Sequence, residues 1–152
     1  MADTPSSKLS VGDRQSDVLH ATCVAVADNA VLIIGPSGSG KSALALQLMA
    51  LGATLVSDDR TSVARHETEI FARPVNGIKG MIEARGVGLL SADIREVASI
   101  CLIVDMGQEE VERLPQYHTY SLFGQKIPLL RKVNAPHFPA AILQYLKEGR
   151  SA

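Results

Sequence analysis

The chain has 152 residues, of which 46% are hydrophobic and 20% charged, a composition typical of a soluble globular protein. This length is enough for one domain with a real core, but not for a second domain of normal size. A net charge of −1 gives no broad basic surface, and no apolar run approaches the ~18 residues needed to cross a bilayer, so a nucleic-acid partner and membrane insertion are both disfavoured.

The N-terminal segment and the two cysteines indicate where the protein works. Residues 1–15 are rich in serine, aspartate and proline, so we expect a flexible tail there and a single domain over residues 16–152. The first ten residues are polar and lack the apolar core of a secretory signal. Cys23 and Cys101 lie in apolar surroundings, which favours reduced thiols over a disulfide or a metal pair. Together these features predict a cytosolic protein.

Two strands are predicted at the start of the domain, over residues 19–27 and 30–34. They flank Asp28 and Asn29, residue types that tolerate positive φ in a two-residue hairpin turn. Simple doubly wound nucleotide folds reach their phosphate loop from a parallel strand with no hairpin in front of it. We therefore predict an α/β fold with a mixed sheet.

The segment behind the second strand fits G-x-x-x-x-G-K-[ST], the phosphate-binding loop of P-loop proteins. Its residues are Gly35, Pro36, Ser37, Gly38, Ser39, Gly40, Lys41 and Ser42. Glycines let several backbone N–H groups converge on a polyphosphate, Lys41 can reach the β and γ phosphates, and the Ser42 hydroxyl can bind Mg²⁺. An ordinary glycine-rich turn is disfavoured because the loop stands between a strand and a helix. The sequence predicts binding of ATP or another polyphosphate together with Mg²⁺.

The remaining elements follow in chain order. A helix is predicted over residues 42–51 with Gly52 after its end, then a buried strand over 54–57. Further predictions are a hairpin from strands 61–65 and 69–72, a long loop around a short ordered piece over 74–92, strands over 97–104, 120–122 and 126–130, and an amphipathic helix over 138–147.

An acidic pair, Asp58 and Asp59, follows the strand that comes after the phosphate-loop helix. Both strand ends should emerge at the same edge of the sheet, which brings the carboxylates towards the γ phosphate. One could hold Mg²⁺ while the other takes a proton from the acceptor, although an Asp-Asp pair can also start a surface turn.

Three other residues are candidates with weaker signals. His20 stands at the start of the first predicted hairpin, where a lone histidine is more often structural than catalytic. Glu83 and Arg85 lie in the glycine-rich 74–92 stretch and could be a metal ligand and a phosphate clamp, or parts of a solvated loop.

Three ordered blocks carry a family resemblance: G-P-S-G-S-G-K-S-A-L-A-L, L-G-A-T-L-V-S-D-D and I-E-A-R-G-V-G-L-L. They resemble the catalytic domain of the HPr kinase/phosphorylase family from about His20 to about Asn134. The sequence departs from the family pattern at Ala43, where the family has glutamate, and at Ala84, where it has isoleucine. Only a short segment precedes His20, so the resemblance implies a short form without the usual N-terminal domain.

The resemblance implies a P-loop domain related in fold to phosphoenolpyruvate carboxykinase. It implies an enzyme that uses ATP to phosphorylate a serine of HPr, a small phosphocarrier of the sugar phosphotransferase system, and that removes this phosphate by phosphorolysis to yield pyrophosphate. Carried over residue by residue, it implies catalytic roles for His20, Lys41 and the acidic pair, with Asp59 as the proton acceptor and Asp58 beside it.

The same resemblance implies further site residues and an assembly. Ser42 and Glu83 would bind Mg²⁺, and residues 82–91 would serve both reactions. Arg113, in a stretch that resembles the family's D-R-L, is a further catalytic candidate. Members of the family form homohexamers.

Two other functions remain open from the sequence. One is a P-loop kinase of a nucleotide or small metabolite, although such kinases usually carry an arginine-rich lid for which this chain has little room. The other is a non-catalytic nucleotide sensor, which would bind a nucleotide tightly and have no phosphoacceptor.

Overall fold

The computed structural model describes residues 15–152, so the tail predicted for residues 1–15 lies almost wholly outside the described part. In chain order the elements are β1 (Ser16–Leu19), β2 (Thr22–Val26), β3 (Asn29–Ile34), α1 (Lys41–Ala50), β4 (Thr54–Ser57), β5 (Thr61–His66), β6 (Glu69–Pro74), β7 (Met81–Ala84), β8 (Gly88–Ser91), β9 (Ala98–Glu109), β10 (His118–Leu122), β11 (Gln125–Lys132) and α2 (Phe138–Glu148). None of the helices in this part of the chain is long and apolar enough to cross a membrane.

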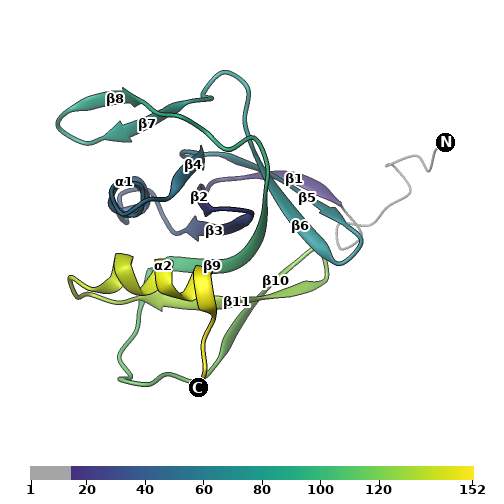
Figure 1. Ribbon diagram of the computed structural model, residues 1–152, viewed down its shortest axis with the longest axis vertical. Helices are drawn as coiled ribbons and strands as arrows, with labels where there is room; N and C mark the ends of the chain where they lie inside the picture. Colours follow the sequence, from purple (N-terminus) through teal and green to yellow (C-terminus); the bar gives the residue numbers. More distant parts are fainter. Residues whose placement is uncertain (1–14) are drawn as a thin grey trace.

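A large mixed sheet forms the centre of the molecule (Figure 1). Its strands follow the order β1-β5-β6-β9-β3-β2-β4. β11 pairs with β9 along one edge and with β10 along the other. β3 runs parallel to β9 and antiparallel to β2, which in turn is antiparallel to β4. The strand that feeds the phosphate loop therefore has one parallel and one antiparallel neighbour, and the predicted α/β fold with a mixed sheet is confirmed.

Both faces of the central strands are buried, which explains why their sequences are almost continuously apolar. Val31 and Ile33 of β3 point to one face, where α1 and α2 cover them with Leu48 and Ile142. Alternate residues of the same strands point to the other face. There they pack against Val63 and residues of β6, β10 and β11, because the sheet curls over itself.

Helix α1 begins and ends close to where the sequence predicts. Gly52 has a φ of +117°, and its N–H donates to the Met49 carbonyl at 3.1 Å. The Ala53 N–H donates to the Leu48 carbonyl at 3.0 Å, which completes a Schellman motif. This C-terminal cap sets the turn that leads directly into β4.

Several predicted boundaries were wrong. The strand predicted over 19–27 begins only at Thr22, and Leu19 is the last residue of a separate strand, β1. The chain leaves the sheet at His20 and Ala21, so that β1 pairs with β5 and β2 with β3. The hairpin turn lies at Ala27 and Asp28, one residue earlier than predicted, with Ala27 at a φ of +53°. β9 continues to Glu109, because β11 pairs along its second half.

The segment predicted as a long loop around a short ordered piece over 74–92 contains a regular hairpin as its ordered part. β7 and β8 pair antiparallel in a separate two-stranded sheet, with Ala84 opposite Gly88. Figure 1 shows this hairpin apart from the large sheet, on the side of α1. Ile82 and Ala84 of β7 are buried, and Ile82, which is 1% exposed, packs with the α1 residues of the core and anchors the hairpin. The sequence shows no steady period here because most of the hairpin is exposed.

Both cysteines are free thiols, as the sequence predicts. Cys23 is fully buried on β2 and Cys101 is partly buried on β9. Burial raises the pKa of both thiols, so they are poor nucleophiles and metal ligands at neutral pH.

Candidate active site

The phosphate loop joins β3 to α1 and requires glycine at two positions for clear steric reasons. Gly35 has a φ of +144°, and a Cβ there would lie 2.7 Å from the Ser39 hydroxyl and 3.2 Å from the Gly107 nitrogen. Gly40 caps α1 with a φ of +97°. No side chain caps this helix and its first turn has no acidic residue, so the N–H groups of that turn are available to an anion.

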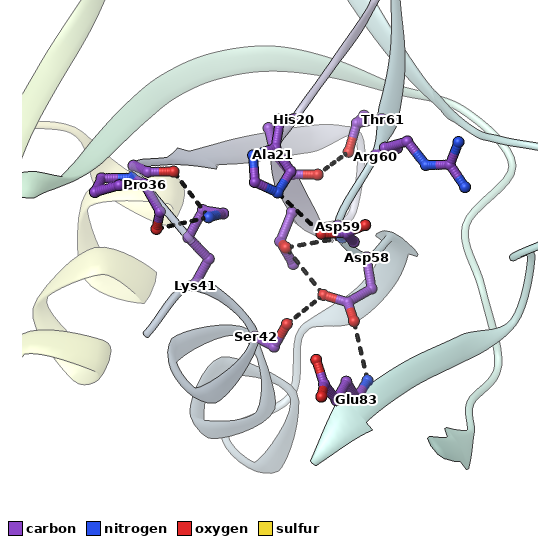
Figure 2. A network of polar contacts seen from close by, with 12 residues as sticks. His20, Ala21, Pro36, Lys41, Ser42, Asp58, Asp59, Arg60, Thr61 and Glu83 are labelled. Carbon is purple, nitrogen blue, oxygen red and sulfur yellow. Dashed lines mark hydrogen bonds and ion pairs between the residues drawn. The ribbon is translucent and has the colours of Figure 1, made fainter. Parts of the chain in front are cut away.

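Lys41 is the first residue of α1 and is only 7% exposed. Its ammonium donates to the Gly35 carbonyl at 2.8 Å and to the Pro36 carbonyl at 3.1 Å, as Figure 2 shows. An ammonium has three donors, so one remains for a phosphate oxygen. Lys41 thus holds the loop closed and places a positive charge in the cradle.

β3 and β4 run in the same direction because each pairs antiparallel with β2. Their C-terminal ends meet at the same edge of the sheet, so Asp58 and Asp59 lie beside the phosphate loop as predicted. The two carboxylates differ sharply in surroundings.

Asp58 is 6% exposed and its carboxylate is fully engaged. It accepts hydrogen bonds from the Thr22 hydroxyl at 2.9 Å, the Ser42 hydroxyl at 2.6 Å and the Glu83 backbone N–H at 2.9 Å. These three donors come from β2, α1 and β7, which are far apart in the sequence. Asp58 therefore ties three elements together at the base of the site (Figure 2).

Asp59 is open to solvent and pairs with His20. The His20 Nε2 atom lies 3.0 Å from an Asp59 carboxylate oxygen, and the two side chains are 48% and 64% exposed. Asp59 adopts a φ of +69°, a left-handed conformation that aspartate tolerates better than most residues. This backbone turn separates the two carboxylates, so that one is buried and the other faces outward.

Thr22 links the two aspartates, and the sequence analysis did not identify it. Its buried hydroxyl donates to the Asp58 carboxylate and accepts the Asp59 backbone N–H at 3.1 Å. This second bond holds Asp59 in its left-handed turn. The only signal in the sequence is a threonine in an apolar strand two residues after His20, which is also the usual pattern of a β-branched core residue.

A cavity of about 440 Å³ joins these parts. The phosphate loop, the start of α1, the His20–Asp59 pair and the β7–β8 hairpin surround it. Its lining residues are His20, Thr22, Ser37, Gly38, Gly40, Lys41, Ser42, Ala43, Leu46, Gln47, Asp59, Glu83, Ala84 and Arg85. The structure thus brings together most of the predicted site residues, including the weakly signalled His20, Glu83 and Arg85.

Arg113 is the predicted site residue that lies apart. It is exposed in the segment between β9 and β10 and does not line the cavity. Its catalytic role therefore stays a prediction.

The donor set beside the loop suits Mg²⁺. Ser42 offers a hydroxyl, and Figure 2 shows the Glu83 carboxylate on the same side of Asp58 as Ser42. Over residues 15–152 there is no group of three or more His, Cys, Asp or Glu side chains that could hold a metal alone. Mg²⁺ is commonly held by one or two protein oxygens together with substrate phosphates and water, so the residues present fit that ion.

Removing the Thr22 hydroxyl tests the link between the two aspartates. Thr22→Val keeps the side-chain shape but leaves Asp58 without one donor and the Asp59 N–H without its acceptor. We expect the free energy of unfolding, measured by urea denaturation, to fall by about 1–3 kcal/mol. Thr22→Ser restores the hydroxyl and should recover most of the loss. Equal stability of Thr22→Val and the wild type would contradict this role.

The fold and the site define the class of protein, a P-loop α/β domain with an exposed carboxylate facing its phosphate loop. The family model described as HPr Serine kinase C-terminal domain matches residues 14–131, and the chain belongs to this family. The match begins slightly before His20 and ends close to Asn134, as the three sequence blocks predict.

Individual relatives agree with this assignment. The chain is 40% identical over 72 residues to the HPr kinase/phosphorylase of Mycoplasmopsis pulmonis, and the matched region covers 47% of this chain and 23% of the relative. It is 33% identical over 109 residues to that of Streptococcus pneumoniae, covering 70% of this chain and 34% of the relative. The match thus spans no more than about a third of these relatives' length.

A solved structure shares the fold. The HPr(Ser) kinase/phosphatase from Coxiella burnetii superposes with a TM-score of 0.72 at 21% identity, covering 86% of this chain and 88% of that chain. The two proteins therefore share the overall fold.

Proposed function

We propose that this domain is an ATP-dependent protein serine kinase that phosphorylates HPr, and that it also removes the phosphate by phosphorolysis. The observation that carries the proposal is the contrast between the two aspartates. Asp58 is buried and fully hydrogen-bonded, whereas Asp59 is exposed, paired with His20 and open to the cavity beside the phosphate loop. The names of the curated relatives point to HPr as the acceptor.

In the forward direction the phosphate loop and Lys41 hold the triphosphate of ATP. Asp59 accepts the proton of the HPr serine hydroxyl as its oxygen forms a bond to the γ phosphorus. The bond from that phosphorus to the β,γ-bridging oxygen breaks, and ADP leaves. His20 orients the Asp59 carboxylate through their 3.0 Å contact. A bound Mg²⁺ held by Ser42 and Glu83 would neutralise phosphate charge.

In the reverse direction orthophosphate occupies the loop and attacks the phosphorus of phosphoserine. The bond to the serine oxygen breaks, protonated Asp59 returns its proton to that oxygen, and pyrophosphate leaves. The same carboxylate serves both directions because each requires one proton transfer at the serine oxygen.

The proposal also covers the setting of the reaction. We propose a cytoplasmic protein that works as a homo-oligomer, with a hexamer implied by the family resemblance. The exposed Arg85, which lines the same cavity, would meet the incoming acceptor. Arg113 is a catalytic candidate on the resemblance alone.

The fate of a labelled γ phosphate tests this function against the two alternatives. The protein is incubated with Mg²⁺, γ-labelled ATP and HPr from the organism that encodes the chain. We expect the label on HPr, released as phosphoserine on acid hydrolysis, and no label on HPr whose acceptor serine is replaced by alanine. Label on a small molecule from a cell extract would identify a metabolite kinase. ATP binding without any transfer would identify a sensor.

A further inference from the structure

A second cavity of about 390 Å³ lies on the other side of the phosphate loop. Its walls come from the start of α1, from β9 at Met106, and from the segment that joins β11 to α2. It shares Gly40, Ala43 and Gln47 with the first cavity, so the two meet across the start of α1.

The position of the acid-base pair determines which part of ATP can enter each cavity. The γ phosphate must lie in the first cavity, because Asp59, His20 and Glu83 line that cavity and not the second. The first cavity must also admit the acceptor serine. A triphosphate lying along the loop with its γ end there directs its α end, and the nucleoside attached to it, away from the acceptor. The path in that direction crosses Gly40, which has no side chain, and Ala43, which has only a methyl group, so it is open.

The lining of the second cavity suits a nucleoside. Met106, Val133, Pro136 and Phe138 give it apolar walls that can pack on a flat base. Asn134 lies at its exposed rim, and its amide makes no hydrogen bond with any residue in the described part of the chain. An amide carries both donors and an acceptor, which is what the edge of a base requires. Lys132 adds a positive charge to the lining of this cavity.

We infer that this second cavity binds the base and ribose of the nucleoside triphosphate whose phosphates occupy the loop. The inference rests on the proposed function, because the position of Asp59 is what places the γ phosphate in the first cavity. It predicts that affinity for ATP has two separable parts. The loop supplies the part that inorganic tripolyphosphate shares, and the second cavity supplies the rest.

Calorimetric titration with Mg-ATP and with magnesium tripolyphosphate separates the two parts. Val133→Phe adds a ring inside the cavity. We expect it to weaken ATP binding by about tenfold or more, since misfit in an apolar pocket costs factors of that order, and to leave tripolyphosphate binding unchanged.

Asn134→Ala changes an exposed residue, so it can test the inference even if Val133→Phe folds poorly. It should weaken ATP binding by about threefold to tenfold, the loss of one hydrogen bond. Val111→Phe makes the same change as the first variant at a residue 82% exposed and outside both cavities, and should affect neither ligand.

The outcomes distinguish this inference from the proposed function. Wild-type protein that binds ATP no more tightly than tripolyphosphate, or variants that lose both ligands in parallel, would overturn the nucleoside site while leaving kinase activity possible. Selective loss of ATP in both variants would support it even if HPr acquired no label. Failure of the wild-type protein to bind ATP would overturn both.

Discussion

Asp59→Asn should lower the rate of phosphoryl transfer to HPr by about 10²–10⁴-fold, the usual contribution of a general base, while ATP affinity stays at the wild-type level. Asparagine keeps an oxygen that can face His20 and tolerates the left-handed φ of +69° found at this position. The substitution therefore removes the proton acceptor with little change to the fold. Single-turnover rates with saturating ATP and HPr measure the effect, and calorimetry measures affinity.

Two matched variants show whether the effect belongs to this carboxylate. Asp93→Asn changes an exposed acid outside the cavity and should leave the rate unchanged. Asp58→Asn places an amide among three hydrogen-bond donors, so it should lower thermal stability, which Asp59→Asn should not. A rate loss under about tenfold in Asp59→Asn would rule out Asp59 as the base.

Lys41→Ala should weaken ATP binding by about tenfold to a hundredfold and lower turnover as well. The ammonium is 7% exposed beneath the loop, so its charge acts on the phosphates with little screening by water. A hydrogen bond to a charged group contributes about 1.5–3 kcal/mol, which corresponds to a loss of this size. Calorimetry with Mg-ATP and with magnesium tripolyphosphate should show the same loss for both ligands, since both place phosphates in the loop.

The control for Lys41→Ala must separate charge from loop structure. Lys41 also donates to the Gly35 and Pro36 carbonyls, so the melting temperature is measured alongside affinity. Lys126→Ala removes an exposed lysine far from the loop in the sequence and outside the first cavity, and should alter neither quantity. Unchanged ATP affinity in Lys41→Ala would contradict the whole description of the site.

Local chemistry made much of the fold predictable. The glycine motif marked the phosphate loop, Gly52 marked the end of α1, and the short hairpin before the loop indicated a mixed sheet. The failures came from long-range pairing. The break at His20 depends on the pairing of β1 with β5, and the extra length of β9 depends on its pairing with β11. The local sequence does not indicate either pairing. The β7–β8 hairpin was missed because only Ile82 and Ala84 of its residues are buried.

The site followed a similar pattern. The order of strands and loop predicted that Asp58 and Asp59 would lie near the phosphates, and the phosphate-loop motif identified Ser42 as a ligand of Mg²⁺. His20 and Glu83 were weak candidates from the sequence pattern, and the family resemblance gave them definite roles. The division of labour between the aspartates was not predictable, because it depends on one left-handed residue and on the Thr22 hydroxyl. The second cavity was not predicted either, because its walls come from three parts of the chain that are far apart in the sequence.

The intact mass of HPr is the most direct measure of the proposed reaction. HPr is incubated with the protein and Mg-ATP, its mass is recorded, and orthophosphate is then added. A gain of one phosphoryl group that orthophosphate reverses, with release of pyrophosphate, is the expected result. An HPr mass that does not change while ATP is bound would contradict the proposal that this site phosphorylates HPr.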